Sequence, residues 1–464
     1  FGSRSACDMI MSKDAAVRML LRARAWRPSV HAGADLRVCR LALQASQRFF
    51  SAGQAASRPL PLAGFRVLEL ASVLAGPSVS QFLAELGADV VKVENKRTRG
   101  DVTRGWLLPG EDKTGVSAYF SCCNLGKRSV AIDASHPHGR NLCQQLAAAS
   151  DVVIASYKPG DAEKFGLDAA TLRADNPRLV YAQITAYGLD DPRVGYDALI
   201  QAEAGFTFMN GEPGPDRQPT KMPVALVDLL AAHQLKESII LALWQRDRTG
   251  EGAYVHCSLL AAAVVSLANQ ATGYLRAGRV PQRMGSDHPS IVPYGTVFLD
   301  KDGLPLLLVV GSDAQFRSLC DVLGQPEMGT DPRYATNTLR VSNRAVLVPL
   351  LTDLIRKEAR ADLLSRLEKR KVPAGAIADM STVFQAPQAE ALVVRSSTEE
   401  GQSSGEALGL RQVAWLGDGV AESSPSKPPK YGEHTAEVLQ EVLGLKFAEV
   451  EELVAQGVAD APNS

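Results

Sequence analysis

A single aspartate, Asp228, lies in the middle of a largely apolar stretch of the sequence. The stretch reads MPVALVDLLAAHQLKESIILALW, from Met222 to Trp244, and the neighbours of the aspartate are valine, leucine and alanine. Burying a carboxylate among such side chains is costly unless it gains a partner or lies at the end of an element. A poorly solvated, well-oriented carboxylate is also a good nucleophile. Asp228 is therefore the first candidate catalytic residue.

The pattern around Asp228 also has a purely structural explanation. An aspartate directly before a helical run is a common N-cap, because its carboxylate accepts a hydrogen bond from a main-chain N–H of the first turn. In that interpretation the helix begins at Leu229, and Val227 and Ala232 form a hydrophobic staple. The two roles do not exclude each other, since the N-terminus of a helix stabilises a negative charge.

Cationic side chains are frequent in the segments that follow the next predicted strands. They are Lys96, Arg97, Arg99, Arg104, Lys127 and Arg128, in ENKRTRGDVTRGW and NLGKRS. A doubly wound sheet is expected to bring these loops to one edge, where arginine and lysine would bind a phosphorylated ligand. A run of charges is also typical of a solvated surface, so both interpretations stay open.

Several common catalytic motifs are absent from the 464 residues. The sequence lacks the GxGxxG, GxSxG, HExxH and Walker A motifs, which disfavours an NAD enzyme, a serine hydrolase, a zinc protease and a P-loop enzyme. The seven cysteines have no CxxC spacing, so we expect no metal site. The net charge of -1 gives no footprint for nucleic acid or an anionic membrane. The longest apolar runs fall short of the roughly 20 residues that cross a bilayer.

From Phe65 onward, apolar strands alternate with helical segments. Strands are predicted at 65–70, 88–95, 127–133, 151–157 and 178–188, helices at 78–87, 136–150 and 229–247, and a strand entering one helix at 255–275. This alternation predicts an α/β fold with a Rossmann-like, doubly wound large domain. A segment rich in Gly and Pro then leads to a hairpin with an Asp-Gly turn and to several helices, which predict a smaller α+β domain. We place the large domain at 61–280, the small domain at 281–394 and a C-terminal segment at 395–464.

The first 60 residues differ in composition from the rest. They contain nine arginines and one lysine against three aspartates and no glutamate, and they are rich in Ala and Ser. This composition is typical of a mitochondrial transit peptide, which we place at 1–50 with processing near Ser51. It predicts a protein of the mitochondrial matrix. A basic tail without a targeting role remains the alternative.

Eight segments, in order, resemble those of CoA-transferase family III, the formyl-CoA transferase and carnitine CoA-transferase type. They are PLAGFRVLELASVLAGPSVSQFLAELGADVVKVE, GDVTRGW, NLGKRSVAIDA, DVVIASYKPGDAEKFGLD, NPRLVYAQITAYG, GYDALIQAEAG, VALVDLLAAH and GEHTAEVLQEVLG, spanning Pro61 to Leu445. The resemblance implies an enzyme in which Asp228 attacks an acyl-CoA thioester and then carries CoA as an aspartyl thioester. It implies no metal or redox cofactor, because the CoA thioester is the substrate. It also implies an interlocked homodimer whose large domain combines N- and C-terminal segments.

The resemblance further assigns contacts to CoA. The matching positions are Leu74, Ala75, Lys96, Arg97, Ile132, Asp133, Ser156, Tyr157, Lys164 and Tyr196. Lys164 stands where the family often has arginine. Asn95 replaces the family's basic residue after the second strand, so Lys96 and Arg97 take that position with a shift of one residue. The glycine-rich flap of formyl-CoA transferase has no clear equivalent in this sequence.

Three further segments and the leader resemble the branch of the family that moves CoA from succinyl-CoA to glutarate in mitochondria. The segments are HPSIVPYG, NTLRVSNR and VPAGAI. The resemblance implies glutarate or a related dicarboxylate as acceptor. The second carboxylate of such an acid needs a cation or hydrogen-bond donors, and Arg283 and His288 are the candidates.

Two other functions remain open from the sequence. The α-methylacyl-CoA racemases share this fold and the aspartate, but they have a histidine where this chain has Tyr196. A tyrosine hydroxyl ordinarily has a pKa of about 10 and is a poor base at neutral pH, which argues against a racemase. A catalytically silent CoA-binding protein is the other alternative, and the presence of Asp228 argues against it.

Overall fold

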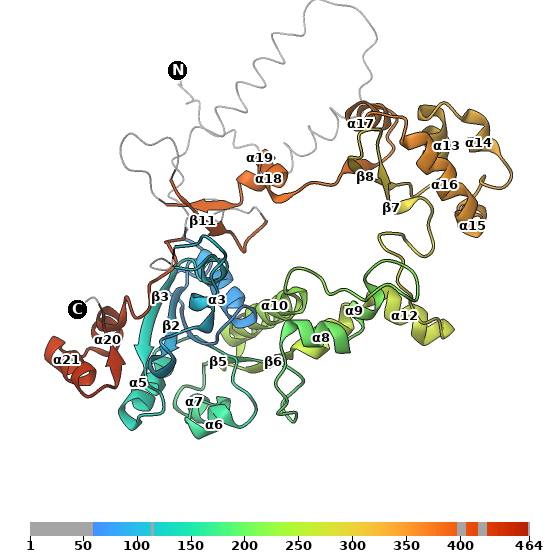
Figure 1. Cartoon of the computed structure of the whole chain (residues 1–464). Helices are drawn as coiled ribbons and strands as arrows, with labels where there is room; N and C mark the ends of the chain where they lie inside the picture. The colour runs from blue at the N-terminus through green and yellow to red at the C-terminus, as the bar shows by residue number, and fades with distance from the viewer. Residues whose placement is uncertain (1–58, 113–115, 397–404, 416–424, 463–464) are drawn as a thin grey trace, which may run out of the picture. The chain divides into compact units, whose positions relative to one another are not determined.

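A computed structural model describes residues 59–112, 116–396, 405–415 and 425–462 (Figure 1). The predicted transit peptide at 1–50 and the processing site near Ser51 lie outside these residues. Within the described ranges, no helix has the length and apolar character needed to span a membrane.

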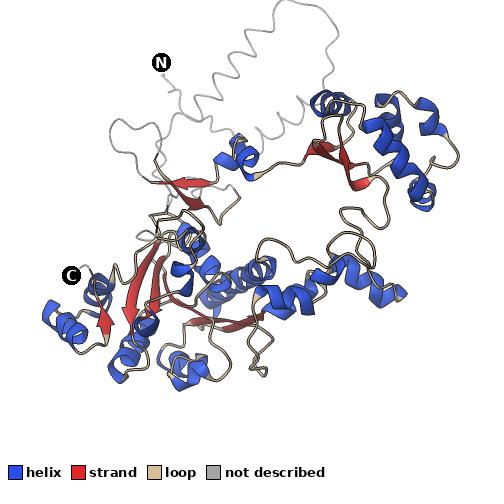
Figure 2. Ribbon diagram, in the orientation of Figure 1, coloured by secondary structure: helices blue, strands red, loops and turns tan. Residues whose placement is uncertain are grey.

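Parallel strands form the large sheet, and the topology explains where a site can lie (Figure 2). The strands are β1 (Arg66–Leu70), β2 (Asp89–Asn95), β3 (Lys127–Ile132), β4 (Val152–Ala155), β5 (Val180–Thr185), β6 (Tyr254–Ser258) and β12 (Ala459–Asp460). Their order is β12-β3-β2-β1-β4-β5-β6, with β12 antiparallel to β3 and the others parallel. The predicted α/β fold with a doubly wound sheet is confirmed. The winding reverses between β1 and β4, and ligands of such sheets bind at the carboxyl ends of the strands near this point.

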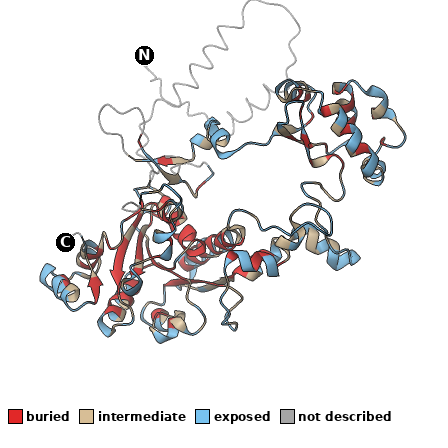
Figure 3. Cartoon of the chain, viewed as in Figure 1, coloured by how far each residue is buried: buried red, intermediate tan, exposed pale blue. Residues whose placement is uncertain are grey.

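Helices cover both faces of this sheet. On one face lie α3 (Ala75–Glu85), α8 (Asp197–Glu203), α10 (Leu226–Thr249) and α11 (Leu259–Val265), and on the other α5 (Pro137–Ala148), α7 (Ala169–Asp175), α20 (Thr435–Leu443) and α21 (Phe447–Ala455). Strands β4 and β5 are buried along their whole length, as the red strands of Figure 3 show. A sheet covered on both faces requires continuous apolar strands, which is why their sequences do not alternate.

Shorter elements lie in the connections between these strands and helices. They are η1 (Lys96–Thr98), η2 (Val102–Gly105), α4 (Ala118–Ser121), α6 (Asp161–Lys164), α9 (Phe206–Met209) and α12 (Ala268–Ala277). The prediction of one helix after the strand in 255–275 was wrong. The helix divides into α11 and α12, because Ala268 has a positive φ of 45° that an α-helix does not accommodate.

A second, antiparallel sheet has its own hydrophobic core. It contains β7 (Tyr294–Leu299), β8 (Pro305–Val309) and β9 (Ala374–Ala376), with α13 (Asp313–Val322), α14 (Pro326–Thr330), α15 (Asn337–Ser342), α16 (Arg344–Ile355) and α17 (Arg360–Lys369). The connection between β7 and β8 contains the predicted Asp-Gly turn, in which Gly303 has a φ of 77°. The chain continues through α18 (Met380–Val383), α19 (Pro387–Glu390), β10 (Val393–Arg395) and β11 (Ala407–Leu410).

Candidate active site

Asp228 lies inside the first turn of α10, not before it. The helix begins at Leu226, its N-cap residue is Ala225, and Ala225 offers no side-chain cap. The prediction that Asp228 is the N-cap of a helix starting at Leu229 was therefore wrong. The helix starts three residues earlier because another side chain, Asp197, accepts hydrogen bonds from its free main-chain N–H groups.

Asp197 is the first residue of α8 and caps α10 from outside. Its Oδ1 accepts hydrogen bonds from the main-chain N–H of Val227 at 2.7 Å and of Asp228 at 3.4 Å. Its Oδ2 accepts from the side-chain amide of Gln201 at 2.6 Å. Sequence reasoning missed Asp197, although it follows Tyr196 in the GYD motif. The sequence feature that could have identified Asp197 is an acidic residue at the start of a predicted helix.

The environment of Asp228 favours its protonated form. The residue is 8% exposed and Asp197 is 9% exposed. Burial, and then the negative charge of Asp197, raise the pKa of Asp228 to about 7. Near neutral pH this carboxyl group thus exists in both forms. A partly desolvated carboxylate of this kind is a stronger nucleophile than an exposed one.

Tyr119 on α4 and the two cysteines that follow α4 lie near the aspartates. Burial, and then the charge of Asp228, raise the pKa of Tyr119 to about 12, so its hydroxyl stays protonated. Its ring packs edge-to-face against Trp106, with ring centroids 4.9 Å apart. The GDVTRGW segment that contains Trp106 thereby contacts the residues around the candidate nucleophile.

The predicted CoA contacts cluster at the carboxyl edge of the large sheet. Leu74 and Ala75 follow β1, and Ser156 and Tyr157 follow β4, so these pairs flank the point where the winding reverses. The main-chain N–H of Ser72 donates to Ser156 Oγ at 3.3 Å, which joins the two loops.

Buried side chains limit what some of these positions can contribute. Leu74, Ala75 and Ile132 are 8%, 9% and 0% exposed, so they offer a ligand little or no surface. Asp133 follows β3, and its Oδ1 accepts hydrogen bonds from the main chain and hydroxyl of Ser135. Ser135 in turn accepts one from Arg97 at 3.3 Å, so the ends of β2 and β3 are joined.

The structure divides the predicted cluster of cations between different places. Lys127 and Arg128 begin β3 and so lie at the amino end of the strand, away from the carboxyl edge. Arg104 is paired with Glu94 at 2.6 Å. The expectation that all six cations gather at one edge was therefore wrong. Lys96, Arg97 and Arg99, directly after β2, remain as candidates for a phosphate.

These three cations have few competing partners. Lys96 Nζ lies 3.4 Å from Asp460 Oδ1, Arg99 lies over the ring of Tyr431, and Arg97 is exposed. Each can reorient toward an incoming anion at small cost, because exposed ion pairs contribute little to stability.

Two other predicted contacts lie at the ends of short helices on the same side of the sheet. Lys164 ends α6 and pairs with Asp161 at 2.6 Å, with 70% of its side chain exposed. Tyr196 immediately precedes α8 and is 63% exposed, directly next to the capping residue Asp197.

A fully buried ion cluster underlies the loop between β1 and α3. Glu69 of β1 accepts from Lys92 of β2 at 2.6 Å and from Lys127 at 2.7 Å, and Lys92 also pairs with Asp101 at 3.0 Å. Burial alone would raise the pKa of Glu69, but the two lysines outweigh it and hold the pKa below its ordinary value. Sequence reasoning missed this cluster, since each charge lies in a different element.

Arg283 and His288 belong to different local structures. Arg283 donates to the carbonyl of Gly214 at 3.1 Å. His288 accepts from the main-chain N–H of Ser290 at 3.1 Å, and its ring packs against Tyr294. Their guanidinium and imidazole groups thus already have neighbours in the described chain.

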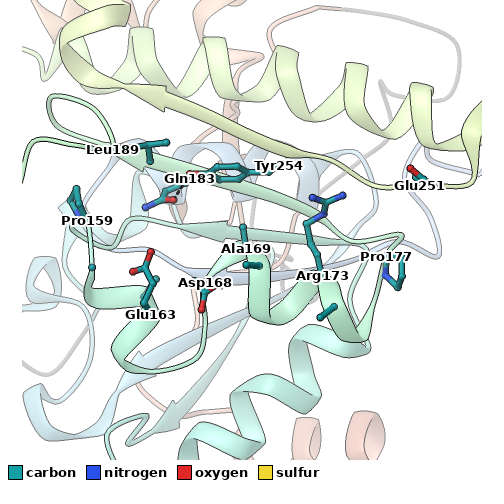
Figure 4. Close-up of a pocket in the computed structure, with 14 residues that line it drawn as sticks. Pro159, Glu163, Asp168, Ala169, Arg173, Pro177, Gln183, Leu189, Glu251 and Tyr254 are labelled. Atoms are coloured by element: carbon teal, nitrogen blue, oxygen red, sulfur yellow. Dashed lines mark hydrogen bonds between the residues drawn. The ribbon is translucent and has the colours of Figure 1, made fainter.

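A cavity of about 760 Å³ opens beside α6 and α7, away from Asp228 (Figure 4). Gln183, Tyr254, Glu163, Asp168 and Arg173 line it. Tyr254 donates to Gln183 at 2.8 Å, and Gln183 reaches the carbonyl of Tyr157 at 3.5 Å. The cavity therefore adjoins the loop after β4 but does not contain the candidate nucleophile. Among the described residues, no group of three or more His, Cys, Asp or Glu is arranged to hold a metal ion.

Comparison with known proteins identifies the family to which this architecture and its buried aspartate belong. The profile of CoA-transferase family III matches residues 62–435, and the chain belongs to this family. The protein is a CoA-transferase, as the resemblance implied.

Individual relatives include CoA-transferases named for glutarate. The chain is 40% identical over 395 residues to a succinate–glutarate CoA-transferase from Agrobacterium fabrum, covering 83% of this chain and 96% of that protein. It is 35% identical to the succinyl-CoA:glutarate CoA-transferase of Mus musculus, covering 86% of this chain and 90% of that one. The crystal structure of a CaiB/BaiF family protein from Brucella suis superposes with a TM-score of 0.71 at 39% identity, covering 83% of this chain and all of that one.

Proposed function

We propose that the protein transfers CoA from succinyl-CoA to glutarate or a related dicarboxylate through a covalent intermediate on Asp228. The observation that carries this proposal is the buried carboxyl of Asp228, whose pKa is raised to about 7 at the start of α10. Relatives named for succinate or succinyl-CoA and glutarate support the choice of acids.

The reaction runs through two exchanges at Asp228. Its carboxylate attacks the thioester carbonyl of succinyl-CoA, which forms a mixed anhydride and releases CoA as a thiolate. The thiolate then attacks the Asp228 carbonyl, which forms the aspartyl–CoA thioester and releases succinate. Glutarate repeats the two steps in reverse and leaves as glutaryl-CoA. Each step exchanges one leaving group for another at an acyl carbon without a change of oxidation state, so the mechanism needs no redox cofactor.

CoA lies along the carboxyl edge of the large sheet in this proposal. Lys96, Arg97 and Lys164 bind its phosphates as cations, and the loops after β1 and β4 bind the rest through main-chain groups and through Ser156 and Tyr157. The exposed positions of Arg97 and Lys164 support this role. The proposed CoA contacts also include Ile132, Asp133 and Tyr196.

Recognition of the acceptor's far carboxylate is assigned to Arg283 or His288. Replacing Arg283 with alanine is expected to raise the KM for glutarate more than the KM for a monocarboxylic acid of similar length. Equal increases for both acids would exclude that role.

We also propose a homodimer in the mitochondrial matrix. The exposed apolar side chains of Leu241 and Trp244 on α10 and of Val264 and Val265 on α11 support a partner surface. Sedimentation of the protein, and of a Val265→Asp variant, tests the dimer. Import of the full chain into isolated mitochondria, with loss of a segment near Ser51, tests the leader.

The decisive experiment is incubation with succinyl-CoA alone, followed by mass spectrometry of the intact protein and of its peptides. We expect a CoA adduct on the peptide that contains Asp228, and loss of both adduct and transfer in Asp228→Asn. Transfer retained by Asp228→Asn would overturn the proposal. Exchange of the α-hydrogen of an acyl-CoA with deuterated solvent, in the absence of an acceptor acid, would instead indicate the racemase. Neither reaction would indicate a silent CoA-binding protein.

A further inference from the structure

Asp197 and Gln201 join α8 to the segment that leads into the nucleophile. Both carboxyl oxygens of Asp197 accept hydrogen bonds from N–H donors, two in the first turn of α10 and one from Gln201. Gln201 also accepts from the main-chain N–H of Met222 at 2.8 Å and reaches the carbonyl of Val224 at 3.3 Å. The residues before α10 and the start of α10 are therefore held by the same pair of side chains.

We propose that Asp197 is a positioning residue for the transfer reaction, which caps the helix of Asp228 and whose negative charge favours acylation of Asp228. The proposal rests on the proposed function, because it concerns Asp228 as the nucleophile. Asp197 itself does not need to touch the substrate.

Hydrogen bonds distinguish the two carboxyl groups, because Asp197 accepts three from N–H donors. A carboxylate that accepts several N–H donors is stabilised as an anion. In the described chain, by contrast, no residue donates a hydrogen bond to the carboxyl of Asp228. Burial, and then the charge of Asp197, accordingly raise the pKa of Asp228.

Several other titratable groups lie around Asp228. After α4, the hydrogen bond with Cys123 lowers the pKa of Cys122, and Cys122 is the group there that most readily carries a second negative charge. On α4, Tyr119 is held protonated by burial and by the charge of Asp228. After α4, the pKa of Cys123 is raised by its hydrogen bond with Cys122 and by burial. On α10 itself, burial lowers the pKa of His233, so its ring is neutral at physiological pH. Lys236 lies two turns further along and contacts Gln412.

The negative charge of Asp197 affects the energy of the first half-reaction. Asp228 begins as a carboxylate beside the Asp197 carboxylate and ends as a neutral aspartyl thioester, while the negative charge departs with succinate. Repulsion between the two aspartates is present before the reaction and absent after it. A fixed Asp197 charge therefore shifts the equilibrium toward the covalent intermediate.

Asp197→Asn separates the charge from the cap, since asparagine keeps an oxygen that accepts from Val227. We expect the acid limb of kcat/KM for succinyl-CoA to move to lower pH by about one unit. We also expect the fraction of enzyme present as the CoA adduct, without acceptor, to fall. A purely structural role of Asp197 would change neither quantity in this direction.

Glu203→Gln is the matched control. Glu203 lies on the same helix and pairs with Arg193 at 3.6 Å, so this change removes one negative charge from α8 without altering the cap. The acid limb of kcat/KM and the fraction of CoA adduct in Glu203→Gln should match those of the unaltered protein.

The outcomes separate this inference from the proposed function. An unchanged acid limb and adduct fraction in a folded Asp197→Asn protein would overturn the inference and leave the function standing. Transfer retained by Asp228→Asn would overturn the function instead. If Asp197→Asn does not fold, carbon-13 NMR of the carboxyl groups in the unaltered protein provides the test. The resonance missing from Asp228→Asn should titrate near pH 7, and an ordinary titration of about pH 4 would overturn the inference.

Discussion

The main-chain N–H of Val73 donates to Oδ2 of Asp101 at 3.2 Å, across the turn that connects β1 to α3. Val73 has a φ of 72°, in the left-handed region that a β-branched residue rarely adopts. Asp101 is itself paired with the buried Lys92, and the Cys123 thiol donates to the Val73 carbonyl at 3.3 Å. A strained turn is thus fixed from both sides at the start of the loop that we propose to bind CoA.

Asp101→Ala is expected to loosen this turn. The change leaves Val73 without its acceptor and Lys92 with one partner fewer, so the free energy of unfolding should fall by about 3 kcal/mol. The KM for succinyl-CoA should rise as well, because Leu74 and Ala75 follow Val73 directly. Urea unfolding and steady-state kinetics measure the two effects. Glu441→Ala, which removes an exposed partner of Arg128, should change stability by no more than about 0.5 kcal/mol.

The buried ion cluster predicts a pH dependence of stability. The lysines around Glu69 and Asp101 outweigh burial and lower the pKa values of both carboxyls. Their contribution is fully present above the unfolded pKa values of about 4 and is lost as the pH falls through the lower folded values. Lys92→Met should therefore reduce the free energy of unfolding strongly at pH 7 and less at pH 3. Urea midpoints across this range test it, and a difference independent of pH would contradict the prediction.

Gly139 allows α5 to approach the end of β3. A Cβ at this position would lie 2.1 Å from the carbonyl oxygen of Asp133, so Gly139→Ala must displace the loop that contains Asp133. We expect a loss of about 1–3 kcal/mol in stability and weaker binding of acyl-CoA. Gly273 on α12 has open space around it, and Gly273→Ala should instead stabilise the protein by up to about 1 kcal/mol. Thermal unfolding and a CoA titration of the two variants distinguish the effects.

Lys236 is a buried cation that the proposed chemistry does not use. It is 6% exposed, and burial lowers its pKa to about 8 although Glu85 opposes the shift. The cost of charging it in the folded state is fully present below pH 8 and disappears as the pH rises toward the unfolded pKa of about 10.4. Lys236→Met should therefore raise the free energy of unfolding at pH 7 by about 2 kcal/mol. An equal gain at pH 10 would show that better packing, not the charge, is responsible.

The sequence predicted the large sheet well because its strands are buried on both faces. Such strands are apolar runs separated by turns, as in β4 and β5. This pattern can be recognised in the sequence without knowledge of distant contacts. The start of α10 could not be predicted in the same way. Its cap, Asp197, lies 31 residues before Asp228 in the chain, so the local pattern pointed to the wrong residue.

The basic residues illustrate a similar limit. Their positions in the sequence showed that they lie near strands. Which end of a strand each cation occupies depends on where the strand begins, and the local sequence does not define this. Lys127 begins β3 and forms a buried ion pair with Glu69. Lys96 instead follows β2, at the edge of the sheet where we propose that CoA binds. Charges that pair across three elements carry no local signature, which is why the ion cluster was not anticipated.

The placement of β12 has a consequence for the order in which the molecule can be made. Residues Ala459 and Asp460 pair with Ala131 and Ile132, so β3 gains its edge partner from a segment far later in the sequence. During synthesis, the outer edge of β3 therefore stays unpaired while more than half of the sequence is still being translated. A chain that ends before Ala459 is therefore expected to leave the edge of β3 unpaired and to aggregate more readily.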